Sequence, residues 1–131
     1  MSNQILMTSD QMTKNKYDLE ERTAKFGEGI IKFARKISGN PVTLPMITQL
    51  VKAGTSVGAN YCEADDAESK KDFKHKIGIC KKEAREVKHW LRMIIIAIPE
   101  LKDEARKLWQ EAKELNLIFN AIVKSTNKNI S

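Results

Sequence analysis

Cysteine, histidine and long apolar runs are scarce in this chain, and each shortage removes a class of protein. The two cysteines, Cys62 and Cys80, lie within helical patterns and have no paired spacing, so neither a disulfide framework nor a zinc knuckle is indicated. The longest purely apolar run, from Met93 to Ile98, is far short of a membrane span. We therefore expect no membrane association.

The N-terminal residues also lack the features of a secretory signal. The sequence MSNQILMTSDQMTKNK has no basic start, no long apolar centre and no small-residue cleavage site. Together with the unpaired cysteines, this predicts a cytoplasmic protein. Of the 131 residues, 41% are hydrophobic and 31% are charged, a balance typical of a folded soluble domain. The length is that of one domain with a sizeable core.

Residues suited to catalysis or metal binding are few. Glu86 and His89 form one Glu-x-x-His pair, whereas a di-metal carboxylate bundle needs two such pairs, and the chain has 2 histidines in all. His89 also lies roughly opposite the apolar stripe of its helix. No serine or cysteine stands in a context that indicates activation by a histidine. We therefore expect no catalytic residue, no metal site and no cofactor.

One long helix dominates what is present. From Ser69 to Ile98 an apolar residue recurs at every third or fourth position, a spacing typical of a helix and not of a strand. Ser69 and Asp72 form a capping box at its start, and Pro99 ends it. A single apolar seam on so long a helix requires partner helices. The seam consists of Phe73, Ile77, Cys80, Ala84, Val87, Leu91, Ile94 and Ile98.

Three further helices follow from the same periodicity. We expect one from Tyr17 with Asp18 as its N-cap, one with Thr43 as its N-cap, and one after Pro99. No strand pattern and no internal repeat is present. The sequence therefore predicts an all-α, antiparallel up-down four-helix bundle in one domain. We place the bundle at residues 17–124, a flexible N-terminal arm at 1–16 and a polar tail at 125–131.

The second helix has an unusual composition. Small residues dominate its centre, and Gly54 and Gly58 lie one turn apart. Such a pair presents a groove without side chains, so a partner helix can approach closely. The same glycines resemble a phosphate-binding loop only superficially, because the lysine and the serine or threonine that should follow are absent. Close packing within the bundle is the better interpretation.

The net charge of +6 is concentrated on the third helix. The segment from Ser69 to Ile98 carries nine basic and three acidic residues, whereas positive and negative residues balance in the rest of the chain. Most of these cations directly follow a seam residue, so they form a stripe beside the buried seam. Such a stripe suits a phosphate backbone, although a merely solvated flank would also look like this. The stripe consists of Lys71, Lys74, Lys81, Arg85, Lys88 and Arg92.

The C-terminal end of the third helix is apolar on nearly all sides, which one four-helix bundle cannot cover. We predict that it contacts another subunit, with wedging under neighbouring loops as the alternative. Trp109 lies one residue off the seam of the fourth helix and is expected on the same surface, as an interface anchor. The predicted contact residues are Trp90, Met93, Ile95, Ile96 and Trp109.

A resemblance to a known family is carried by the segment QLVKAGTSVGANYCEADDAESKKDFKHKIGICKKEAREVKHWL. It resembles the signature of bacterial four-helix bundle proteins often encoded within intervening sequences of 23S ribosomal RNA genes. The resemblance implies a short cytosolic protein that assembles into a ring of five identical subunits, and it implies no catalytic residue. Within its pattern, we read Ser56, Asn60 and Glu83 as candidates for a polar network between the second and third helices.

In architecture and charge the chain is also similar to the basic accessory proteins of diversity-generating retroelements, which associate with nucleic acid. We therefore predict a non-enzymatic oligomeric protein that binds nucleic acid, structured RNA in the first place, through the basic stripe. Aromatic residues do not alternate with the cations, so reading of single-stranded bases is not indicated. The alternative is a ring-shaped scaffold that binds a protein partner.

Overall fold

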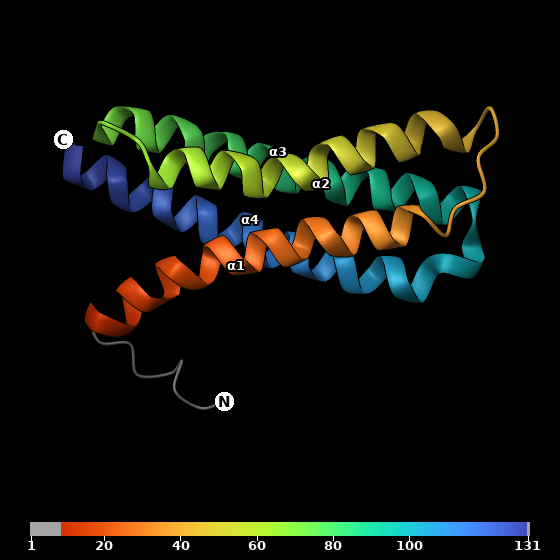
Figure 1. The fold of residues 1–131 in the computed structure, drawn as a ribbon, viewed down its shortest axis with the longest axis horizontal. Coiled ribbons are helices and arrows are strands. Elements are labelled where there is room, and N and C mark those ends of the chain that lie inside the picture. Colours follow the sequence, from red (N-terminus) through yellow and green to blue (C-terminus); the bar gives the residue numbers. More distant parts are fainter. Residues whose placement is uncertain (1–8, 131) are drawn as a thin grey trace.

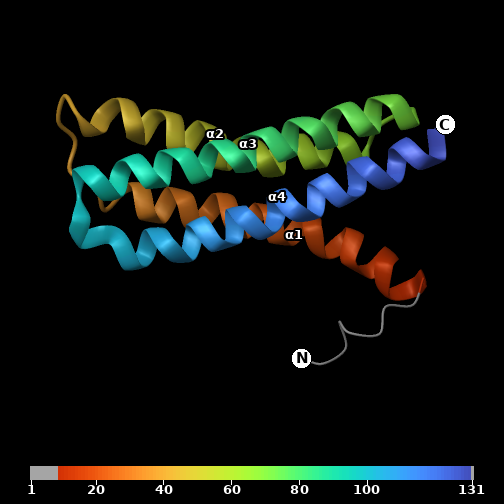
Figure 2. The same ribbon diagram turned by 180° about the vertical axis from the view of Figure 1, so that it is seen from behind.

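The computed structural model describes residues 9–130, and side chains within residues 18–128. These residues form four long α-helices and a short 3-10 turn, with no strand among them (Figure 1). Each helix packs against the next one along the chain, and α4 returns to α1 (Figure 2). The predicted all-α four-helix domain is confirmed. The elements are α1 (Ser9–Ala34), α2 (Thr43–Asp65), α3 (Lys70–Ala97), η2 (Pro99–Leu101) and α4 (Lys102–Ile130).

One continuous hydrophobic core runs between the four helices. Ile30, Leu50, Leu91 and Phe119, one from each helix, are fully buried in it. The predicted seam of α3 is confirmed, because six of its eight residues are buried and the two at its ends are partly buried against the core. The core also holds the thiol of Cys80, where burial raises the pKa to about 12.

The helix caps follow the sequence signals in part. Ser69 caps α3 as predicted, since its hydroxyl accepts a hydrogen bond from the backbone N–H of Asp72 at 3.0 Å. The prediction that Thr43 caps α2 is wrong. The side-chain oxygen of Asn40 accepts a hydrogen bond from the Thr43 N–H at 3.0 Å, while the Thr43 hydroxyl donates to the Ser38 carbonyl at 2.7 Å. Asn40 does the capping because the Thr43 side chain is turned back into the loop.

Two helices extend beyond the sequence prediction. α1 begins at Ser9 and passes through Asp18, so Asp18 is not an N-cap. α4 continues through residue 125, where we expected a polar tail, and ends at Ile130. Neither extension contains proline or glycine, so nothing in the sequence stops the helix there. Residues 1–8 of the predicted arm lie outside the described residues.

α1 and α2 pack closely where α2 carries glycine. A Cβ on Gly54 would lie 2.8 Å from two side-chain carbons of Ile30, and one on Gly58 would lie 3.3 Å from the backbone oxygen of Thr23. Real Cβ atoms do not approach neighbours as closely as 2.8 Å, so any side chain at Gly54 would displace α1 or Ile30. The predicted close approach of a partner helix to this part of α2 is confirmed.

Candidate nucleic-acid interface

The six predicted cations share one flank of α3, and the contacts of Lys88 and Lys81 place that flank beside α4. The Lys88 ammonium lies 5.2 Å from the centre of the Trp109 ring of α4. The backbone carbonyl of Lys81 accepts a hydrogen bond from the side-chain amide of Asn116, also on α4, at 2.7 Å. All six side chains are at least partly exposed. Among the residues with described side chains, none of the carboxylates forms an ion pair with them.

α4 adds a second row of cations on the same side. Trp109 and Asn116 mark the flank of α4 that faces α3. Residues that lie three, four, seven or eight positions from these two share that flank of the helix. Four of them are exposed cations, and the ammonium of one lies 5.8 Å from the centre of the Trp109 ring. This second row consists of Lys102, Arg106, Lys113 and Lys124.

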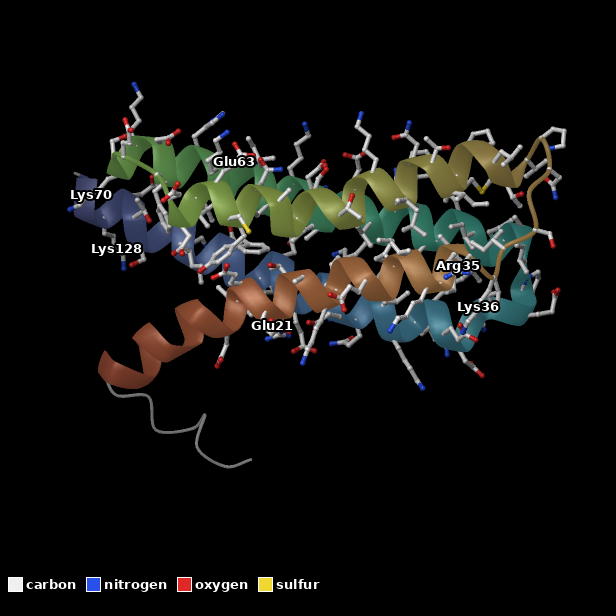
Figure 3. All side chains as sticks on the ribbon, viewed as in Figure 1. Glu21, Arg35, Lys36, Glu63, Lys70 and Lys128 are labelled. Atoms are coloured by element: carbon white, nitrogen blue, oxygen red, sulfur yellow. The ribbon has the colours of Figure 1, made fainter. Side chains whose placement is uncertain are left out.

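The acidic residues of α4 point to the other side of the helix. Glu104 accepts a hydrogen bond from the ammonium of Lys36 at 2.7 Å, and Figure 3 shows Lys36 near the end of α1. Glu111 and Glu114 both accept hydrogen bonds from Arg22, at 2.7 and 3.2 Å. These ion pairs place three carboxylates of α4 on the side toward α1 and the turn that follows it, away from the cations on the flank toward α3.

The carboxylates of α3 are separated from its cations in the same way. Ser56 of α2 lies close enough to Glu83 to lower the pKa of its carboxyl, which places Glu83 on the side of α3 toward α2, and Glu86 lies one turn further along the same flank. The remaining two carboxylates of α3 and α4, Asp72 and Asp103, stand in the first turns of their helices. The six cations of α3 and the four of α4 therefore share one outer surface, which we call the basic face. Figure 2 shows α3 and α4 side by side, seen from this side of the bundle.

The basic face suits a phosphate backbone better than unstacked bases. At about 1.5 Å per residue, the 28 residues of α3 give it a length of roughly 40 Å. Its tryptophan, Trp109, is half-buried and lies under the ammonium groups of Lys88 and Lys113, so no bare ring is presented for a base to stack on. Rows of exposed ammonium and guanidinium groups can neutralise phosphates without reading sequence.

Sequence reasoning missed the part of the basic face that lies on α4. Net charge does not reveal these cations of α4, because the acidic and basic residues of the chain outside α3 are equal in number. The helical spacing of Lys102, Arg106, Trp109 and Lys113 was the available signal. Which neighbouring helix this flank of α4 faces depends on how the four helices pack, and that packing joins residues far apart in the chain.

Of the predicted polar network of Ser56, Asn60 and Glu83, the two residues on α2 make hydrogen bonds within that helix, where the Ser56 hydroxyl donates to the Lys52 carbonyl at 2.6 Å. Ser56 and Glu83 lie together across α2 and α3, whereas the Asn60 amide donates to the backbone oxygen of Ser56 on its own helix, at 2.9 Å. Burial and then the neighbouring Glu86 carboxyl raise the pKa of Glu83, and the Ser56 hydroxyl acts in the opposite direction. The Trp90 indole N–H donates to Glu86 at 3.5 Å. Sequence reasoning did not include Glu86 in this cluster.

The predicted contact residues do not form one surface. Trp109 lies on the basic face with Lys88, whereas Trp90 lies on the opposite flank of α3, so their expected common surface is wrong. The two residues Lys88 and Trp90 are two positions apart on a helix, and their side chains therefore point about 200° apart. Ile95 and Met93 are half-buried, and Ile96 is 80% exposed.

Among the residues with described side chains, no group of three or more histidine, cysteine, aspartate or glutamate residues could hold a metal ion. None of the described helices combines the length and apolar character required to cross a membrane.

Comparison with known proteins places the chain in a family. The family model described as 23S rRNA-intervening sequence protein matches residues 15–121. This chain belongs to that family. The family resemblance expected from the sequence is thereby confirmed.

A solved structure supports the family fold. A crystal structure from Bacteroides thetaiotaomicron VPI-5482, described as a protein with unknown function from the S23 ribosomal protein family, is 27% identical to this chain. The match covers 81% of this chain and 98% of that one, with a TM-score of 0.74. None of the curated proteins matches this chain. Membership in the 23S rRNA-intervening sequence protein family therefore establishes the fold, and function has to be argued from the site.

Proposed function

We propose that this protein binds structured RNA through the basic face and catalyses no reaction. One observation supports the proposal above all, namely the separation of charge on α3 and α4. Ten cations share the outer face of the two helices, while three of their seven carboxylates pair with Arg22 or Lys36 and a fourth, Glu83, lies beside Ser56 of α2. A surface of one sign and this length attracts a polyanion and releases its counterions.

The ligand class follows from what the basic face offers. Phosphate groups are bound by lysine and arginine, whereas single-stranded bases need exposed aromatic rings or splayed edges. Trp109 is covered by two ammonium groups, which favours a paired RNA over a single strand. The name of the family refers to an intervening sequence of 23S rRNA, so RNA is the natural first probe.

Removing charge from α3 should weaken RNA binding and reduce its salt dependence. The binding of a fully paired RNA hairpin, measured by fluorescence anisotropy, is expected to weaken by about a thousandfold or more between roughly 50 and 200 mM salt. In the double variant Lys81→Gln with Arg85→Gln, two phosphate contacts are lost. The slope of log K against log salt should therefore fall by about 2.

A matched control separates the basic face from net charge. Lys32 on α1 and Lys52 on α2 are exposed and lie outside the basic face. Lys32→Gln with Lys52→Gln removes the same charge and should leave the slope nearly unchanged. Equal losses in the two double variants would contradict a role for the basic face, and absence of binding by the parent protein at low salt would refute the proposed function.

A second candidate function is that of a scaffold, in which this antiparallel bundle is one subunit of a ring of five. The observation in its favour is exposed apolar surface at one end of the bundle, where α2 begins and α3 ends. Ile96 is 80% exposed there, and Val42 and Leu44 are 59% and 55% exposed. Exposed large apolar side chains at one end of a bundle can mark a contact between subunits.

Light scattering with Ile96→Glu tests this assembly. The parent protein is expected to form a homo-oligomer at micromolar concentration, with a mass near five subunits. A carboxylate at position 96 would be desolvated in a subunit contact, so the variant should shift toward monomer. A monomeric parent would contradict the ring, and RNA binding by that monomer would leave the first proposal standing.

A further inference from the structure

Gly78 interrupts the row of cations on α3, and packing does not account for it. From Phe73 to Leu91, every residue that directly follows a seam position is a cation except Gly78, which follows Ile77. Glycine inside a helix is less stable than alanine. A Cβ on Gly78 would meet no atom within 4 Å, whereas a Cβ on Gly54 would collide with Ile30. The fold therefore tolerates a side chain at position 78.

The surroundings of Gly78 suit a phosphate group. Lys74 and Lys81 lie one helical turn on either side of it, and Lys71 and Lys82 extend the same patch. All four side chains are at least partly exposed. Because Gly78 has no side chain, the molecular surface lies closer to the backbone of α3 at this position than at the neighbouring lysine and arginine positions. An anion can approach the helix itself at this point while ammonium groups reach it from both sides.

The register between α3 and α4 places Asn120 of α4 at about the level of Gly78 along the bundle. Lys81 contacts Asn116 and Lys88 contacts Trp109, so residue numbers on α4 increase in the direction in which those on α3 decrease. One turn beyond the first of these contacts brings Asn120 to the level of Gly78. Asn120 is half-buried, and within the part of the chain with described side chains its amide makes no hydrogen bond.

We propose that Gly78 is the point where the sugar-phosphate backbone of RNA comes closest to this protein. One phosphodiester group lies between Lys74 and Lys81 and accepts a hydrogen bond from the Asn120 amide. The inference rests on the proposed RNA binding and adds a contact site to it. It also differs from a diffuse charged surface, because atoms added at position 78 weaken binding even when they carry positive charge.

The experiment measures RNA affinity and thermal stability for a series at position 78, with the paired RNA hairpin as the probe. Gly78→Gln should weaken binding by at least about fivefold and lower the salt slope by about 1, since one phosphate contact is lost. Gly78→Lys completes the cation row and should still bind no more tightly than the parent. Asn120→Ala should weaken binding by about threefold. Ala59→Gln, on the exposed surface of α2, is the matched control and should leave affinity unchanged.

The variant Gly78→Ala distinguishes loss of the proposed phosphate contact from destabilisation of the fold. This variant should melt higher than the parent, because alanine favours the helix and its methyl group meets nothing, and it should nevertheless bind RNA more weakly. Tighter binding by Gly78→Lys, or unchanged binding by Gly78→Gln, would overturn the contact site while the parent still binds RNA. A parent protein that does not bind the hairpin would overturn the proposed function and this site with it.

Discussion

Reversing two cations of α4, Arg106→Glu with Lys113→Glu, should weaken binding of the paired RNA hairpin by about 100-fold at low salt. The six cations of α3 are untouched in this variant, so an interface confined to α3 predicts little change. On the basic face, each substitution removes one phosphate contact and places a carboxylate beside the RNA backbone. The slope of log K against log salt should fall by about 2 to 4.

The control for this prediction keeps the same net charge. Lys32→Glu with Lys52→Glu changes two exposed residues of α1 and α2 and should reduce affinity by less than about threefold, since both lie outside the basic face and no phosphate contact is lost. Circular dichroism should show the same helix content in both double variants. If the two pairs weaken binding equally, net charge and not the arrangement on α3 and α4 governs the interaction.

Replacing Gly54 with valine should destabilise the fold by about 3 kcal/mol or more, because the added carbons overpack a closed contact. A Cβ alone would lie 2.8 Å from Cγ1 and Cγ2 of Ile30, which is fully buried. α1 would have to move away from α2, and neighbouring core contacts would be lost. Urea unfolding monitored by circular dichroism measures the free-energy change.

A double-mutant cycle checks the cause of that loss. Ile30→Ala removes the side-chain atoms that a valine at position 54 would strike, so the two substitutions together should cost less than the sum of their separate effects. Gly78→Ala supplies the helix-propensity reference, since its methyl group meets no neighbour within 4 Å. Additive effects of Gly54→Val and Ile30→Ala would contradict the close packing of α1 on α2.

The core of the bundle was predictable from periodicity because burial on a helix follows from a local repeat. The seam of α3, the Ser69 cap and the close-packing glycines of α2 were all identified this way. The errors arose at helix ends. Asn40 replaces Thr43 as the cap of α2, and α1 runs through Asp18, because several polar residues near a helix start compete for the same backbone N–H groups.

The candidate site was predictable only for its half on α3. The sequence stripe from Lys71 to Arg92 stands beside its own seam, and one helix is enough to define that relation. The half on α4 requires knowledge of which flank faces α3. The same missing knowledge led to the wrong grouping of Trp109 with Trp90, since two residues near the core edge of different helices can face opposite sides of the bundle.

The sequence by itself determined that this protein is a four-helix bundle with a basic third helix, and it was enough to identify the family. Spacing and charge along one helix are local properties of the chain, so they can be read without a partner. Only the tertiary structure decided that the cations of α4 join those of α3. That outcome follows from the packing of the buried face of α4 against the other helices, and the ion pairs of Arg22 with Glu111 and Lys36 with Glu104, which span 89 and 68 residues of the chain, lie on the side of α4 toward α1.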